Sequence, residues 1–217
     1  MFKSIKQFAK LCVCRGNPAD INDRTSTLVI LFLTLSVLEC ATNFGMGWLS
    51  WINSSPGVQT IVADVFRVLG KICGHLFVAL CLYVVLHFRS LPQNFRHAYS
   101  SYLGVCIIIA LVSLMVIGAT VLMSSPQDLA ASFRRQNGYL IIGGTMFLVV
   151  SMVYLVSTVW KVLAFGCILY KSMKIKFWQA GIVAIMLVQA PEIFDAFAEL
   201  IGFLVHAIEF SSQFGIF

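Results

Sequence analysis

Long, unbroken apolar runs are the feature that most constrains what this chain can fold into. Five such runs follow Arg24, and each holds roughly twenty or more residues, enough for a helix to cross a hydrocarbon core about 30 Å thick. A backbone surrounded by lipid must satisfy its own hydrogen bonds, and the runs are continuous rather than alternating, which favours helices over a barrel. With 59% hydrophobic and 11% charged residues, the chain is too apolar for a soluble domain. The sequence predicts an all-α, polytopic transmembrane helix bundle.

The predicted organisation is one short leader followed by one membrane domain. Residues 1–24 form a basic leader in which Phe2, Ile5, Phe8 and Leu11 recur at helical spacing, so we expect an amphipathic helix at the membrane interface. Residues 25–217 form the transmembrane domain, with spans expected at about 25–44, 61–88, 99–123, 139–165 and 177–200. Turn residues are concentrated at 45–57, and Pro191 should kink the last span.

Basic residues are distributed unevenly between the predicted loops. With five spans and a cytoplasmic amino terminus, ten Lys and Arg residues fall in cytoplasmic segments, whereas the opposite loops hold only Arg134 and Arg135. The positive-inside rule therefore places the amino terminus in the cytoplasm and the carboxyl terminus outside. The chain does not identify its membrane, which is either a bacterial inner membrane or a eukaryotic endomembrane.

Charged residues inside the predicted spans form two stripes. Helical spacing places one set on a single face of the second span and another on a single face of the last, with one more acid near the outer end of the first span. The second span carries Asp64, Arg67, Lys71 and His75, the last span carries Glu192, Asp195, Glu199 and His206, and the first carries Glu39. Intramembrane charges cost several kcal/mol unless they are paired or hydrated. We therefore expect the two stripes to contact each other.

Three interpretations of this polar cluster remain open. The first is structural, with ion pairs that fix helix register and fill the bundle interior. The second is a water-accessible cavity for an ion, a proton or a lipid headgroup. The third, a metal site built on His75, is disfavoured because neither helix has ligands at a recognised metal spacing. The sequence implies no cofactor.

Other residues have simpler interpretations. Gly70 and Gly74 form a small-xxx-small pair, which suits close helix packing and leaves homodimerisation as an alternative. Lys161 is expected to extend its ammonium to the headgroups at the cytoplasmic end of its span. Cys12 and Cys14, beside the leader, suit acylation, and the seven cysteines show no paired framework, so we expect no disulfide.

Two stretches resemble the Yip (Ypt-interacting protein) family. The segment Asn94 to Tyr102 resembles the family's sequence before its middle spans, and Trp160, Gly166, the basic turn at 171–176 and Gln179-Ala180-Gly181 are similar to its fourth and fifth helices. The resemblance covers about half of the chain, from Arg89 onward. A proline common after the Tyr-Ser pair is missing, and the 24-residue leader matches the short bacterial-type members. The resemblance implies an accessory protein without catalytic residues.

We therefore expect a non-enzymatic membrane protein that acts as a scaffold, membrane-organising or accessory factor. No nucleophile elbow, His-Glu-x-x-His or phosphate loop is present, and the chain lacks a basic patch interleaved with aromatics that would suit nucleic acid. Its expected partners are membrane lipids and other membrane proteins or further copies of itself. A small transporter or channel component that uses the polar cluster is one alternative, and a subunit of a larger complex is another.

Overall fold

The computed structural model describes residues 2–21, 25–51, 58–123, 133–136, 139–142 and 144–213, with side chains described within 6–21, 25–42, 65–123 and 147–202. The helices of the described part are α1 (Phe2–Cys12), α2 (Thr25–Trp51), α3 (Val58–Phe88), α4 (Phe95–Met123), α6 (Gly144–Met173), α7 (Phe177–Val188) and α8 (Ala190–Gln213). Two short 3₁₀ turns, Pro18–Asp20 and Pro92–Asn94, precede α2 and α4. A hairpin of β1 (Phe133–Gln136) and β2 (Tyr139–Ile142) precedes α6.

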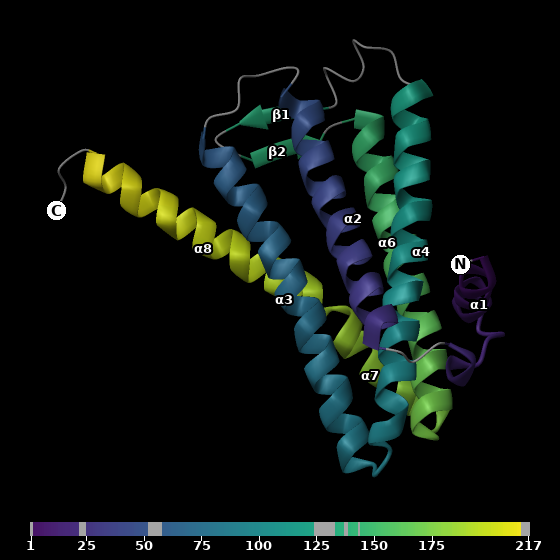
Figure 1. The fold of residues 1–217 in the computed structure, drawn as a ribbon. Helices are drawn as coiled ribbons and strands as arrows, with labels where there is room; N and C mark the ends of the chain where they lie inside the picture. Colours follow the sequence, from purple (N-terminus) through teal and green to yellow (C-terminus); the bar gives the residue numbers. More distant parts are fainter. Residues whose placement is uncertain are drawn as a thin grey trace.

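Within the described residues, five segments are long and apolar enough to cross a membrane, as predicted. They are Thr25–Thr42, Val65–Phe88, Pro92–Met123, Phe147–Met173 and Phe177–Gly202. Figure 1 shows the turns from α3 to α4 and from α6 to α7 at one end of the bundle and the hairpin at the other. The chain therefore crosses from end to end in the order that five consecutive spans require.

Two predicted boundaries differ from the structure. The helix that contains the first span does not end at residue 44, because α2 continues through Gly45 and Gly47 to Trp51. A helical glycine costs only about 1 kcal/mol, so these turn residues do not end an otherwise apolar helix. The fourth span starts later than residue 139, because residues 139–142 form β2, which pairs antiparallel with β1. Gly144 has φ +61°, outside the helical range, so α6 cannot extend back across it.

The last span is divided in two near Pro191, as the sequence predicts. Helix α7 ends at Val188 and α8 begins at Ala190. Proline has no amide hydrogen to donate back to the preceding turn, so one helical hydrogen bond is lost at this point. In Figure 1 α8 leaves the bundle obliquely and crosses α3. This change of direction brings the acidic stripe against the basic one.

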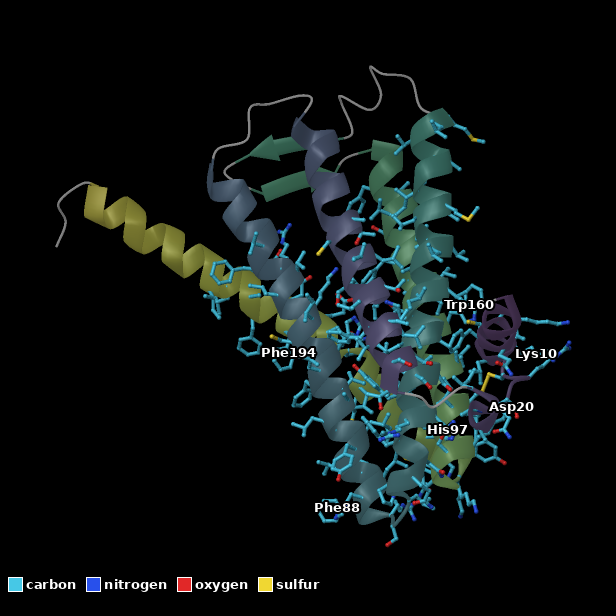
Figure 2. The ribbon with its side chains drawn as sticks, in the orientation of Figure 1. Lys10, Asp20, Phe88, His97, Trp160 and Phe194 are labelled. Atoms are coloured by element: carbon cyan, nitrogen blue, oxygen red, sulfur yellow. A yellow bond between two sulfur atoms is a disulfide. The ribbon has the colours of Figure 1, made fainter. Side chains whose placement is uncertain are left out.

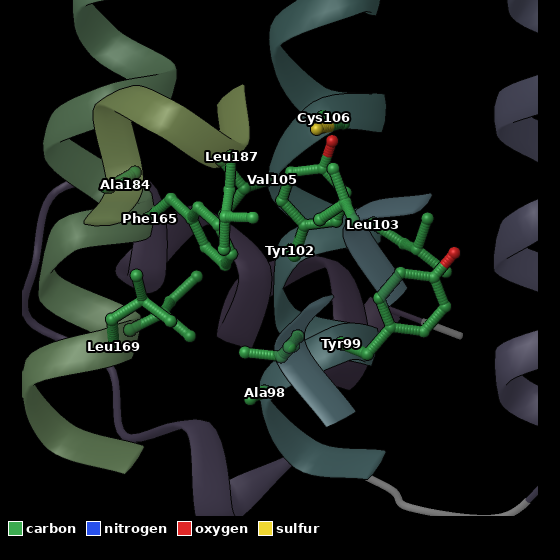
Figure 3. Packing of buried hydrophobic residues seen from close by; sticks show 14 of the residues in the cluster. Ala98, Tyr99, Tyr102, Leu103, Val105, Cys106, Phe165, Leu169, Ala184 and Leu187 are labelled. Atoms are coloured by element: carbon green, nitrogen blue, oxygen red, sulfur yellow. The ribbon is translucent and has the colours of Figure 1, made fainter. Parts of the chain in front are cut away.

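The apolar core lies where α4, α6 and α7 meet. Tyr102 and Phe165 pack with their ring centroids 4.7 Å apart, and Leu169, Ala184 and Leu187 surround them (Figure 3). Each of these five side chains is buried. The core occupies the half of the bundle nearer the α6–α7 turn, so helix packing is tightest there.

The leader packs on the protein, a contact that the expected interfacial helix did not include. Phe8 and Leu11 are buried against the bundle, and a Cβ at Gly104 of α4 would collide with the Phe8 ring. Trp160 Nε1 donates a hydrogen bond to the Cys12 carbonyl at 2.7 Å. Figure 2 shows Trp160 beside α1 and Lys10 pointing away from the bundle. The predicted amphipathic pattern is present, but α4 and α6 cover the described part of its apolar face.

The cysteines correct two further expectations. Cys14 and Cys167 form a disulfide across 153 residues, because the docking of the leader brings their Cα atoms to 5.7 Å. The expectation of no disulfide is therefore wrong. Cys14 in this form has no thiol to acylate, and Cys12 is 5% exposed, with its pKa raised to about 11 by burial. Neither side chain is placed for the predicted acylation, because both are used in docking the leader.

Candidate functional site

Close packing of α3 on α8 positions the charged residues. A Cβ at Gly74 would meet the backbone of Pro191, and one at Gly70 would meet the Phe194 carbonyl at 2.7 Å and the Ala198 methyl at 2.8 Å. Helix packing through Gly70 and Gly74 is therefore confirmed, within one chain. Helix α8 covers both glycines within the chain, and homodimerisation through them stays a prediction.

The two charged stripes contact each other, as predicted. Arg67 on α3 forms an ion pair with Glu199 on α8. One turn further along, Lys71 Nζ lies 3.9 Å from Asp195 Oδ2 and 3.5 Å from Glu39 Oε2 of α2. Three helices thus share the charges, and Lys71 is held between two carboxylates. Pairing of this kind offsets much of the cost of placing charges inside a membrane.

His75 links the cluster to α4. Its Nε2 lies 3.8 Å from Glu39 Oε1, and its Nδ1 shares a hydrogen bond of 3.0 Å with the Tyr102 hydroxyl. The Tyr99 hydroxyl donates a hydrogen bond to the His75 carbonyl at 3.2 Å. Neither tyrosine was predicted from the sequence to belong to the cluster. Their helical spacing on α4, three residues apart, was the available indication.

A cavity of about 220 Å³ lies beside the ion pairs, between α2, α3, α4, α6 and α8. Its volume is below the roughly 300–1,000 Å³ of pockets for drug-sized ligands, so it suits a small polar group. Charged residues of both signs reach it, together with hydroxyl groups and aliphatic side chains. The polar lining consists of Glu39, Thr42, Lys71, Ser113, Tyr154, Ser157, Thr158, Lys161 and Glu192.

Lys161 lines this cavity, which corrects its predicted place at the headgroups. Helix α6 ends at Met173, about three turns beyond Lys161, so the residue lies well inside its span. Its side chain is half-buried. The indication in the sequence was that Lys161 is the one charged residue in the apolar run from 139 to 170.

Two charges in the cavity differ from the rest of the cluster. Among residues with described side chains, Lys161 and Glu192 make no ion pair, although they have opposite signs and line the same space. The predicted partner stripe is therefore only partly engaged, because Asp195 and Glu199 pair with α3 and Glu192 does not. The side chains of Asp64 and His206 lie outside the described residues.

Metal binding has no geometric support in the part of the chain that the structure describes. Within that part, no group of three or more His, Cys, Asp or Glu side chains is arranged to hold a metal ion. His75 has an acid on one side and a tyrosine on the other. The site is thus a set of ion pairs and hydrogen bonds next to a cavity with two further charges.

No protein-family model matches this chain, and no curated protein or solved structure is significantly similar to it.

Proposed function

We propose that this protein is a non-enzymatic accessory factor of its membrane that binds a small polar ligand, such as a lipid headgroup, inside the helix bundle. A single observation supports the proposal. Lys161 lies inside a span, its side chain lines a cavity, and it makes no ion pair with a described residue. A lysine in this environment is costly unless something neutralises or hydrates it.

The rest of the cluster explains why binding is favoured over a purely structural role. Arg67, Lys71 and His75 already have partners on α2, α4 or α8, and these contacts are sufficient to fix helix register. Lys161 and Glu192 are not members of these pairs. Intramembrane ionisable groups without a structural role are candidates for function.

The orientation of the chain is part of the proposal. Positive-inside counting supports a cytoplasmic amino terminus and an external carboxyl terminus. The Yip-like segments and the accessory role that they imply also remain predictions.

A transporter would use the same cavity and is the second candidate. The observation in its favour is that charged side chains from four helices, α2, α3, α6 and α8, line one cavity. A transporter must open the cavity to water on each side in turn, whereas an accessory protein needs only to hold its ligand. Uptake of the bound species into liposomes that contain the purified protein separates the two, since only a transporter accumulates it.

The binding proposal is tested by thermal unfolding of the full chain in detergent. Phosphatidylethanolamine, phosphatidylcholine, phosphatidylglycerol and the soluble glycerophosphoethanolamine are added separately to the wild type, to Lys161→Met and to the control Lys10→Met, which removes an exposed charge from the leader. A ligand at ten times its Kd stabilises the folded state by about 1.4 kcal/mol, or roughly 3–6 °C for a chain of this size.

We expect at least one of these compounds to raise the Tm of the wild type and of Lys10→Met but not of Lys161→Met. If none gives a shift that depends on Lys161, the proposed function is wrong.

A further inference from the structure

A second, apolar cavity adjoins the charged one along the seam between α4 and α6. It measures about 210 Å³ and shares Ile109, Ser113, Val153 and Ser157 with the charged cavity. The Ser113 and Ser157 hydroxyls hydrogen-bond to each other across the seam at 2.8 Å. A polar space and an apolar space thus lie on either side of one pair of serines.

The apolar cavity faces the surroundings of the bundle. Its wall includes Val116, Met152 and Val156, which are 43%, 61% and 60% exposed, and Trp160 also lines it. Because α4 and α6 lie in membrane-spanning segments, these exposed aliphatic side chains face lipid tails. The groove therefore fits an acyl chain that enters from the bilayer.

The charges of the polar cavity restrict the headgroup. An anion alone would neutralise Lys161 and leave Glu192 unpaired, and a cation alone would do the reverse. A zwitterion satisfies both. A primary ammonium donates up to three hydrogen bonds and so suits the Glu192 carboxylate, whereas a quaternary ammonium donates none and is usually held by several aromatic rings. The polar cavity has one aromatic side chain, Tyr154, among the lining residues described.

From these two cavities we infer that the protein binds a zwitterionic aminophospholipid of the phosphatidylethanolamine type. Lys161 binds the phosphate and Glu192 the ammonium group. One acyl chain lies in the groove between α4 and α6, and Ser113 and Ser157 exchange their mutual hydrogen bond for the ester oxygens. This inference rests on the proposed function and adds the class of ligand and its route from the bilayer.

The test measures lipid binding to the full chain in detergent by native mass spectrometry. Palmitoyl-oleoyl phosphatidylethanolamine should bind the wild type at least tenfold tighter than the matching phosphatidylcholine or phosphatidylglycerol. Lys161→Met and Glu192→Gln should each abolish this preference, and Lys161→Arg should retain it. Lys10→Met and Asp20→Asn, which alter exposed charges of the leader region, serve as controls that keep the preference.

The groove is tested separately with Val156→Trp, which fills the apolar cavity and leaves the polar lining unchanged. It should weaken lipid binding at least tenfold while the binding of glycerophosphoethanolamine stays the same. Val159→Trp on the same helix is the matched control, because Val159 is 52% exposed and lines neither cavity. Folding of each variant is checked by its unfolding temperature without lipid.

The outcomes separate the inference from the proposed function. Binding of phosphatidylglycerol that depends on Lys161 but not on Glu192 would overturn the zwitterion and leave the binding function intact. Lipid binding unaffected by Val156→Trp would overturn the groove alone. Absence of any binding that depends on Lys161 would overturn both.

Discussion

Single residues decide how closely the helices of this bundle approach. Gly74 faces the backbone of Pro191, so α3 and α8 meet there with no side chain between them. Gly118 on α4 shows the opposite case, because a Cβ added to it would meet nothing within 4 Å. The sequence placed both glycines in spans, but only the packing distinguishes the one that is required.

Gly74→Ala should therefore destabilise the protein, and Gly118→Ala should not. The new methyl at residue 74 would force α3 away from α8, and overpacking of this kind costs about 1–3 kcal/mol. At residue 118, exchange of a helical glycine for alanine should be neutral or stabilising by up to about 1 kcal/mol. Thermal unfolding in detergent compares the two variants, and equal effects would contradict the packing of α3 on α8.

Cys12 reports on the docking of the leader through its ionisation. Burial raises its pKa from 9.0 to about 11, so the thiol form predominates at neutral pH and only the thiolate reacts with alkylating reagents. We expect the alkylation rate of Cys12, followed by peptide mass spectrometry, to rise about tenfold per pH unit and to level off near pH 11.

The variant Gly104→Leu provides the comparison, because a side chain there displaces the Phe8 ring and with it the leader. Its Cys12 should react faster at neutral pH, with a plateau near pH 9. A plateau near pH 9 in the wild type would show that the leader is not docked.

At the scale of helices, ion pairs hold α8 at its oblique angle. Apart from the break near Pro191, α8 is attached through its packing on α3 and through the pairs that Arg67 and Lys71 make with it. The two stripes face each other because both recur with the helical period, which is visible in the sequence. The third acid, Glu39, lies on α2 and contacts both Lys71 and His75. No spacing within one helix predicts these contacts between helices.

Reversal of one charge in the Arg67–Glu199 pair should be rescued by reversal of the other. Arg67→Glu places two acids against each other and should lower the unfolding free energy by about 1–3 kcal/mol, less than for a fully buried pair because Glu199 is 43% exposed. Adding Glu199→Arg should restore most of this loss.

Lys10→Glu is the control, since Lys10 is exposed and reversal there should cost little. If Glu199→Arg fails to restore stability in the presence of Arg67→Glu, the pairing of these two residues is contradicted.

At the scale of the whole molecule, the candidate spans predict an odd number of crossings between the two ends of the chain. The five apolar segments, together with the turns at one end and the hairpin at the other, give this arrangement. We expect a tag fused to Met1 and a tag inserted at Lys174 to lie on the same side of the membrane, so that both are protected from protease added to the other side. A tag at Phe217 should lie on that opposite side. Tags at Met1 and Phe217 that are cleaved from the same face would contradict the five-span topology.

Hydropathy by itself determined which segments are long and apolar enough to cross a membrane, and where charges interrupt them. Those properties depend on whether each residue prefers lipid or water, and that preference is local. The two charged stripes were visible as well, because each lies on one helix and has the helical period. Their contact was expected from the cost of unpaired charges in lipid.

Only the tertiary structure decided what depends on the rotation and docking of helices relative to one another. Packing turned Lys161 into the cavity, brought the leader onto α4 and α6, and joined Cys14 to Cys167. It also placed the charged and apolar cavities side by side at Ser113 and Ser157. Residues far apart in the chain meet at each of these places, and no periodicity within one segment records which distant face it will contact.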